Sequence, residues 1–323
     1  MLARDEQTSQ RPTNPADFDE GRIDARSELL FGRAALNQLA TSVVLVFGLG
    51  GVGSSCVEAL ARGGVGNLFL VDRDVIEASN INRQALAFRS TVGRAKTDIM
   101  RAMVADINPN AHVEARHAYV SRDNAAVLFD EALAAFGRID YVVDCIDTMT
   151  QKIVIAQIAQ ERGLRHLASM GGAHRLHPEL LRFADLAETT VCPMCIAARK
   201  VARKAGLEHM QVLYTPERPV NVAHWERDTD GSVRKPPLGT ASFFPPIMGQ
   251  MMAGRVICDL TGIEEVVAAQ EQARAATARG SRPKTRRARR QAAAQSAPVQ
   301  ATIDSGEAPV GETLTPGVTP DEA

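Results

Sequence analysis

The sequence predicts an α/β fold, a Rossmann-like and mostly parallel sheet with helices on both faces. Apolar runs alternate with helical patterns through the middle of the chain, which is typical of such sheets. A glycine-rich segment directly follows the first apolar run, where nucleotide-binding sheets turn from strand to helix. The chain has 323 residues, 45% of them hydrophobic, so it can bury one sizeable core.

The expected elements follow in chain order. An amphipathic helix comes first, because apolar residues recur at helical spacing: Leu29, Leu30, Phe31, Ala34, Ala35, Leu36 and Leu39. Apolar segments then predict strands at 43–48, 67–72, 112–117, 139–145 and 165–170. Helical patterns predict helices at 53–62, 94–107, 121–135 and 150–162. After residue 172 we expect a strand at 180–183, a helix at 192–205, a strand at 211–214 and a helix from Pro246.

The ends of the chain differ from its middle in composition. We expect a disordered leader at 1–25, one nucleotide-binding domain at 26–262 and a disordered tail at 263–323. Within the tail, residues 274–290 hold eight Lys or Arg and no acid, whereas 291–323 hold five acids and no base. The basic block is a candidate RNA contact, and a purely solvated arm is the alternative.

A long connection at 216–240 is rich in proline, glycine and charge. Connections of that length are usually functional, so we expect a crossover or a flap here. Its Trp225 is a candidate for stacking on a nucleic-acid base.

Charge and cysteine content restrict the class of protein. The formal net charge of −1 gives no global attraction to nucleic acid or to an anionic membrane. Five cysteines, an odd number, with Cys145 in an apolar strand, argue against a disulfide framework and for a cytoplasmic location. No signal-peptide core is found near the N-terminus. The apolar stretch 243–260 contains Arg255 and Asp259, so no membrane segment is predicted.

The glycine-rich segment predicts a nucleotide site. Gly48, Gly50 and Gly53 have G-x-G-x-x-G spacing after a strand, and Asp72 ends the next strand. Such glycines let backbone N–H groups approach phosphates at a helix N-terminus, while the carboxylate accepts a ribose hydroxyl. This fingerprint alone favours an NAD-dependent oxidoreductase.

The polar residues after Asp72 favour a different chemistry. They are Asp74, Asn80, Asn82, Arg83, Gln84 and Lys96. Cations and amides around phosphates meet the charge that spreads over the non-bridging oxygens when phosphorus is attacked. Arg83 and Lys96 are the expected catalytic donors. Asp147 follows a strand at the carboxyl edge of the sheet, and its carboxylate is the expected Mg²⁺ ligand.

These motifs resemble the ThiF-type, ATP-dependent adenylating superfamily of ubiquitin-activating enzymes and sulfur-carrier adenylyltransferases. The resemblance covers 26–262 and includes Gly51, which completes Gly-x-Gly-Gly-x-Gly. Later segments resemble the branch that dehydrates threonylcarbamoyladenosine in tRNA: Gly171-Gly172-Ala173, Asp185-Leu186-Ala187, Val191-Cys192-Pro193, Arg199-Lys200 and 239–249.

The resemblance implies that ATP and Mg²⁺ activate the threonyl carboxylate as an acyl-adenylate and release pyrophosphate. Attack from within the same modification then closes a cyclic oxazolone and expels AMP, so effective concentration replaces an enzyme nucleophile. It also implies a homodimer in which Arg26 reaches the partner's ATP. A cysteine desulfurase or another sulfur-relay protein is a further expected partner.

A rival hypothesis is an adenylyltransferase for a ubiquitin-like sulfur carrier. That branch usually holds zinc with two Cys-x-x-Cys pairs, but here only Cys192, Cys195 and Cys258 are available, too few for four sulfur ligands. Cys192 and Cys195 open a predicted helix and are either a reactive thiol pair or small packing residues. Asp147 is followed by Thr148, whereas the superfamily often has Asn at that position. The residue expected to make a second contact beside the metal is therefore not the usual one.

Overall fold

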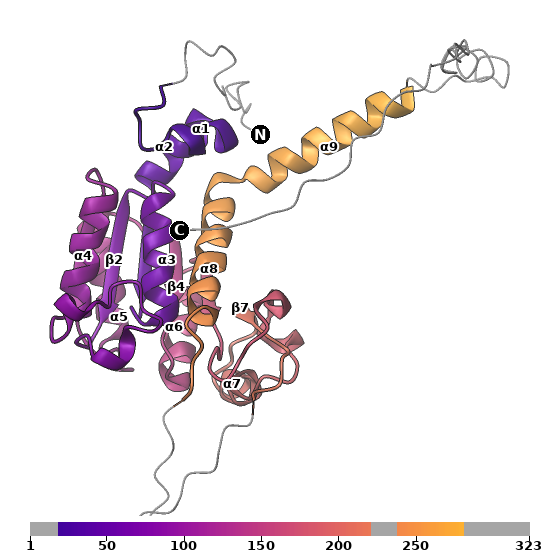
Figure 1. The fold of residues 1–323 in the computed structure, drawn as a ribbon. Coiled ribbons are helices and arrows are strands. Elements are labelled where there is room, and N and C mark those ends of the chain that lie inside the picture. The colour runs from indigo at the N-terminus through magenta and orange to yellow at the C-terminus, as the bar shows by residue number, and fades with distance from the viewer. Residues whose placement is uncertain (1–18, 221–237, 281–323) are drawn as a thin grey trace, which may run out of the picture. The chain divides into compact units, whose positions relative to one another are not determined.

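The computed structural model describes residues 19–220 and 238–280, with side chains described as far as residue 272 (Figure 1). One sheet of seven strands has the order β3-β2-β1-β4-β5-β7-β6. The strands are β1 (Val43–Phe47), β2 (Asn67–Asp72), β3 (His112–His117), β4 (Tyr141–Asp144), β5 (His166–Ser169), β6 (Arg182–Asp185) and β7 (Gln211–Tyr214). Neighbouring strands are parallel except β6 and β7, so the predicted fold class is confirmed.

The α-helices of the described residues alternate with these strands. They are α1 (Ala25–Phe31), α2 (Arg33–Thr41), α3 (Gly51–Arg62), α4 (Lys96–Ile107), α5 (Ala125–Phe136), α6 (Met149–Glu161), α7 (Pro193–Lys204), α8 (Phe244–Thr261) and α9 (Ile263–Gly280). None of the helices in the described ranges is both long and apolar enough to cross a membrane.

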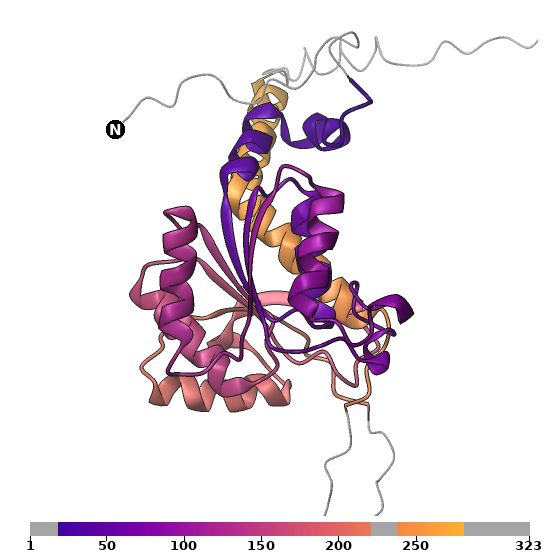
Figure 2. The same cartoon turned by 90° about the vertical axis from the view of Figure 1, so that its left-hand side faces the viewer.

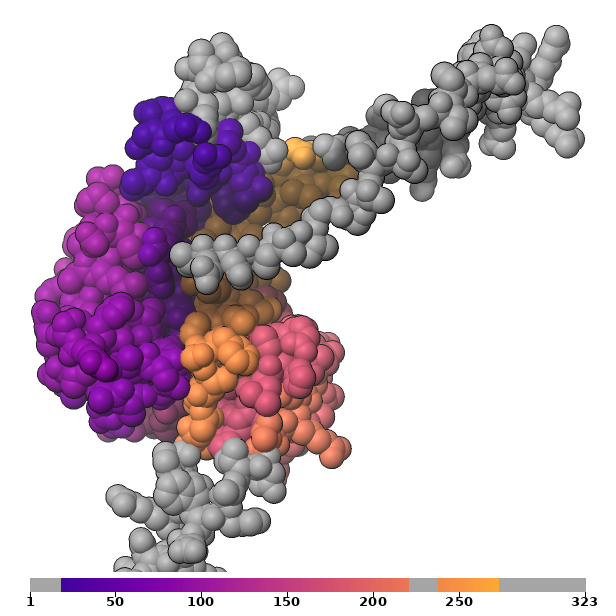
Figure 3. All heavy atoms as spheres, in the orientation of Figure 1, coloured from indigo at the N-terminus to yellow at the C-terminus, as the bar shows by residue number. Residues whose placement is uncertain are grey.

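The two faces of the sheet are covered by different helices (Figure 2). Val44 and Val46 of β1 pack with α3, α4 and α8, whereas Leu45 and Phe47 pack with α5 and α6. A third cluster joins α6 and α7 to β5 and β7. In the space-filling view, the orange surface around the start of α8 lies between the purple and the pink parts of the chain (Figure 3). Burial on both faces explains why β1 is a continuous apolar run.

The strand order positions the site. The chain builds β1, β2 and β3 toward one edge and then returns to β4 on the other side of β1. Open α/β sheets bind ligands outside the carboxyl ends of the strands where the order reverses in this way. Phe47 pairs with Val71 and with Asp144, so the ends of β1, β2 and β4 lie side by side.

Several predicted element boundaries are corrected. Gly32, with φ +80°, divides the expected first helix into α1 and α2. The strand expected at 180–183 lies at Arg182–Asp185, because Pro178–Leu180 form a 3₁₀ turn. The expectation of disorder from residue 263 is wrong over Ile263–Gly280, which form α9.

Other expectations lie outside the described residues. These are most of the leader, Trp225 with most of its connection, the acidic block, and the basic block except for the backbone of its first residues. The chain divides into two compact units, residues 1–267 and 268–323. The boundary that we place at residue 262 stays a prediction.

Candidate functional site

The glycine turn between β1 and α3 packs tightly against its neighbours. Gly48 has φ +89°, and a Cβ there would lie 3.0 Å from the carbonyl group of Cys145. A Cβ on Gly53 would lie 1.8 Å from the carbonyl oxygen of Gly48. Gly50 has open space around its Cβ position. The turn is therefore held close to the sheet, and the N-terminus of α3, which favours anions, begins directly after it.

Asp72 connects this turn to the end of β2. One carboxylate oxygen accepts the backbone N–H of Leu49 at 2.6 Å, and the other accepts that of Asp74 at 2.7 Å. Asp72 is buried, yet it lines the cleft described next. Its carboxylate therefore holds the turn in shape in addition to the ribose contact that the sequence predicts.

A cleft of about 900 Å³ opens at the carboxyl ends of β1, β2, β4 and β5. It brings together most of the predicted site residues: Gly48, Gly50, Gly51, Asp72, Asp74, Asn80, Arg83, Gln84, Lys96 and Asp147. These residues come from five separate segments of the chain. Their convergence provides backbone donors, two cations and several carboxylates around one volume large enough for a nucleotide.

Lys96 and Arg83 are held by short contacts. The Lys96 ammonium lies 2.8 Å from a carboxylate oxygen of Asp74, and its side chain is only 5% exposed. The Arg83 guanidinium donates to the carbonyl oxygen of Ser79 at 3.0 Å and to the amide oxygen of Asn82 at 2.9 Å. Both cations are thus positioned without a ligand, as preorganised electrostatic stabilisation requires.

Three predicted site residues lie outside this cleft lining. Gly53 faces the backbone of Gly48. Asn82 donates to the carbonyl oxygen of Thr240 at 3.1 Å, which ties it to the segment before α8. Arg26 lies on α1 with its side chain 83% exposed and paired with Glu20 at 3.2 Å. The ligand contacts that we expect for these residues stay predictions.

The residues present fit Mg²⁺ bound mainly through phosphate and water. Asp147 is exposed and lines the cleft, and Thr148 donates to its carboxylate at 3.2 Å, so Thr148 does contact this group. Within the described ranges, no group of three or more His, Cys, Asp or Glu could hold a metal ion. Mg²⁺ commonly takes one or two carboxylates and completes its octahedron with substrate phosphates and water.

A buried charged pair beneath Asp147 escaped the sequence analysis. Asp144 is fully buried, and its carboxylate accepts the Lys152 ammonium at 3.0 Å and the backbone N–H of Ile146 at 3.0 Å. The second Asp144 oxygen and Nε2 of His166 are buried without a partner. Burial lowers the pKa of His166 to about 4. This cluster fixes the loop that carries Asp147. In the sequence, the only sign of the cluster is an Asp at the end of a strand with a Lys eight residues later.

An aromatic contact on the cleft wall was also missed. The Arg73 guanidinium lies 4.6 Å from the centre of the Tyr119 ring, and Gln151 donates to the Tyr119 hydroxyl. Arg73, Tyr119 and Gln151 all line the cleft. A half-exposed ring held from two sides is suited to stacking on a base. A lone Tyr after a strand carries no sequence signal for this role.

Cys192 and Cys195 lie at the start of α7, next to the cleft residue Met194. Both are buried in the cluster beneath α7. The hydrogen bond between the two thiols lowers the pKa of Cys192 to about 5 and raises that of Cys195. The pair is therefore both a packing element and a potential thiolate, and both alternatives from the sequence stay open.

The fold and the cleft define an α/β protein with two cations, Arg83 and Lys96, in a cleft at the switch point of its sheet. The ThiF family model matches residues 25–297, so the chain belongs to the ThiF family.

Relatives of known name support this assignment. The chain is 37% identical over 244 residues to tRNA threonylcarbamoyladenosine dehydratase of Bacillus subtilis, covering 73% of this chain and 93% of that protein. It is 32% identical over 171 residues to the Escherichia coli protein of that name, covering 53% of this chain and 62% of the relative.

Solved structures agree with the fold. TcdA (CsdL) matches with a TM-score of 0.65 and 26% identity, covering 74% of this chain and 94% of that one. The E. coli TcdA complex with ATP matches with a TM-score of 0.66 and 24% identity, covering 77% and 98%.

Proposed function

We propose that the chain is an ATP-dependent enzyme that dehydrates threonylcarbamoyladenosine in tRNA to its cyclic oxazolone form. The observation that carries this proposal is the convergence of the glycine turn, Lys96, Arg83 and Asp147 on one cleft. The similarity to the Bacillus dehydratase, which covers 93% of that protein, supports the choice of substrate. The same cations disfavour a nicotinamide oxidoreductase, because hydride transfer has no use for donors that stabilise a reacting phosphate.

The proposed reaction begins with attack of the threonyl carboxylate on the α-phosphorus of ATP. A bond forms between carboxylate oxygen and phosphorus, the bond to pyrophosphate breaks, and Arg83 and Lys96 stabilise the charge on the non-bridging oxygens. When bound at Asp147, Mg²⁺ neutralises phosphate charge. The carbamoyl oxygen then attacks the activated carbonyl and forms the ring C–O bond, the bond from that carbonyl carbon to the phosphate oxygen breaks, and AMP leaves. A carbamoyl N–H proton is released to solvent, so the nucleoside has lost the elements of one water.

We infer that the enzyme is a cytoplasmic homodimer in which Arg26 of one subunit serves the ATP of the other. The exposure of Arg26 on α1, outside its own cleft, supports this inference. A cysteine desulfurase or other sulfur-relay protein stays a predicted partner. The lowered pKa of Cys192 is the feature that favours the second candidate function, activation of a sulfur-carrier protein.

The deciding experiment incubates the purified protein with ATP, Mg²⁺ and tRNA that carries threonylcarbamoyladenosine. Gently digested nucleosides are then examined by mass spectrometry, and we expect the modified nucleoside to lose one water. A tRNA transcript without the modification is the control. If no water is lost and pyrophosphate exchange appears only with a glycine-ended carrier protein, the sulfur-carrier function replaces the dehydratase.

A further inference from the structure

A cationic face on α7 has no role in the reaction described above. We name it the α7 basic face; it consists of Arg199, Lys200, Arg203 and Lys204. At 3.6 residues per turn these four positions fall within an arc of about 140° on the helix. The opposite side carries Cys195, Ala198 and Ala202, which are buried against the sheet.

The charge of this face is not neutralised locally. Lys200, Arg203 and Lys204 are exposed, and within the described ranges their side chains form no ion pair or hydrogen bond. No acidic residue occurs from 189 to 207. Arg203 and Lys204 in the last turn also complement the helix dipole. Lys200 lies too far from the helix end for that explanation.

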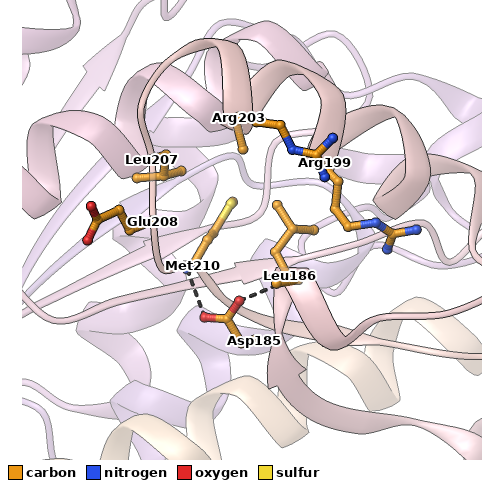
Figure 4. A pocket seen from close by; sticks show the side chains of 9 residues that line it. Asp185, Leu186, Arg199, Arg203, Leu207, Glu208 and Met210 are labelled. Atoms are coloured by element: carbon orange, nitrogen blue, oxygen red, sulfur yellow. Dashed lines mark hydrogen bonds between the residues drawn. The ribbon is translucent and has the colours of Figure 1, made fainter.

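Two carboxylates line the pocket beside this face, those of Asp185 and Glu208. Asp185 accepts the backbone N–H groups of Ala187 at 2.8 Å and Met210 at 3.2 Å (Figure 4). Arg199 donates to the carbonyl oxygen of Thr189 at 2.7 Å. Figure 4 shows Arg199 and Arg203 extending from α7 to the same side above a pocket of about 210 Å³. The two arginines therefore line one concave surface, and among the described residues neither forms an ion pair with Asp185 or Glu208.

The helix that carries the α7 basic face begins at the cleft. Met194 in the first turn of α7 lines the cleft, and Lys204 ends the helix about 15 Å further along its axis at 1.5 Å per residue. Arg199, the first residue of the face, lies about 7.5 Å beyond Met194 along the axis, within reach of a polyanion that has one group in the cleft. RNA-binding proteins commonly take a splayed base into a pocket and contact the neighbouring phosphates with cations.

We propose that the α7 basic face binds the sugar–phosphate backbone of the tRNA whose modified nucleoside enters the cleft. The choice of RNA as the partner rests on the proposed function. The face supplies affinity and orientation rather than sequence recognition, because phosphate contacts carry no sequence information. Neutralising it weakens binding in a salt-dependent manner, since each lost phosphate contact lowers the number of released counterions.

The test compares two triple variants with the same charge change. One carries Lys200→Gln, Arg203→Gln and Lys204→Gln. The matched control carries Arg62→Gln, Arg101→Gln and Arg138→Gln, three exposed cations that do not line the cleft. Binding of a fluorescent, unmodified tRNA transcript is measured from about 50 to 200 mM salt, a range in which phosphate contacts dominate the change in affinity.

We expect the α7 variant to bind the transcript at least tenfold more weakly and to lose about two units of the slope of log affinity against log salt. The control variant should retain the wild-type slope, and ATP affinity should be unchanged in both. Equal losses in the two variants, or wild-type binding by the α7 variant, would overturn the proposal. So would loss of binding to a glycine-ended carrier protein with tRNA binding intact.

The failure of this proposal is separable from that of the proposed function. The transcript carries no threonylcarbamoyladenosine, so its binding does not depend on the dehydration reaction. If the α7 variant binds the transcript more weakly but the wild-type protein removes no water from modified tRNA, the proposal for the α7 basic face stands and the proposed function fails. If the wild-type protein dehydrates modified tRNA but the α7 variant binds the transcript as tightly as the wild type, the proposed function stands and the proposal for the α7 basic face fails.

Discussion

Lys96 is a cation that the fold removes from water in advance of any ligand. Its ammonium contacts Asp74 at 2.8 Å, while Asp74 itself is half exposed and faces the cleft. A lysine with a small hydration shell and a fixed position can stabilise charge on phosphate without reorganisation. The Lys96–Asp74 pair is therefore suited to a transition-state role more than to stability.

Lys96→Ala should lower turnover of modified tRNA about a hundredfold or more, as loss of one transition-state donor typically does. ATP affinity should fall much less, because backbone N–H groups of the glycine turn still contact the phosphates. Single-turnover dehydration and equilibrium ATP binding measure the two effects. Arg94→Ala, an exposed cation of the same segment that does not line the cleft, is the control and should retain turnover. Full turnover in Lys96→Ala would remove its assigned role.

His166 predicts a pH dependence of stability. Its folded-state pKa of about 4 lies below the ordinary value of about 6.5, because burial disfavours the imidazolium. Below pH 6.5 the unfolded chain therefore binds a proton that the folded chain does not. The free energy of unfolding should fall between about pH 6.5 and 4, by roughly 3 kcal/mol from this residue alone.

The measurement is urea unfolding of the wild type and His166→Leu across that range. Carboxylates contribute equally to both proteins, so the difference between the two curves isolates the histidine. We expect the variant to lose less stability than the wild type as pH falls. Parallel curves would show that His166 titrates normally in the folded protein.

Single residues were predictable from the sequence where a motif fixes their spacing. Arg83, Lys96 and Asp147 belong to such a motif, and the cleft contains all three. Asp144, Lys152 and His166 were not recognised, because their meaning depends on joint burial of residues from β4, α6 and β5. Spacing along the chain does not encode that convergence.

At the scale of elements, the glycine turn combines two physical requirements in one loop. Gly53 permits close approach of α3 to the end of β1, whereas Gly50 has no protein atom near its Cβ position and lines the cleft. The sequence pattern assigns both to the nucleotide. The structure separates a packing glycine from one that leaves room for a ligand.

Gly53→Ala should lower the free energy of unfolding by about 1–3 kcal/mol or more, because its methyl group meets backbone and no rotamer avoids the contact. Gly50→Ala should keep wild-type stability and weaken ATP binding. Gly254→Ala in α8, where space is open, should stabilise the protein by about 0.5–1 kcal/mol through helix propensity. Chemical denaturation and ATP titration of the three variants check this order. Equal stability of Gly53→Ala and the wild type would contradict it.

Element types were largely predictable, but the boundaries at Gly32 and residue 263 were not. The apolar spacing continues from Leu30 to Leu36 across Gly32, so periodicity alone gives one helix. Residues 263–280 contain few large apolar side chains and were expected to be disordered for that reason. Alanine and glutamate favour helix without an apolar core, which explains α9.

At the scale of the whole molecule, the site within one chain contains Lys96, Arg83 and Asp147 but not Arg26. Arg26 lies on α1, at the start of the described domain, and contacts Glu20. In a twofold-symmetric dimer, if α1 of one subunit supplies a residue to the partner's site, α1 of the partner supplies the same residue in return. The inferred dimer therefore makes each site depend on residues from two chains.

Mixing two inactive variants tests that dependence. A dimer of Arg26→Ala with Lys96→Ala has one site with both defects and one site with none, provided that Arg26 acts on the partner's ATP. After subunit exchange about half of the dimers are mixed, so about a quarter of wild-type turnover should return. Lys96→Ala mixed with Arg83→Ala is the control and should stay inactive, since these two residues share one cleft. No recovery in the first mixture, with Arg26→Ala inactive and dimeric, would place Arg26 in its own subunit's site.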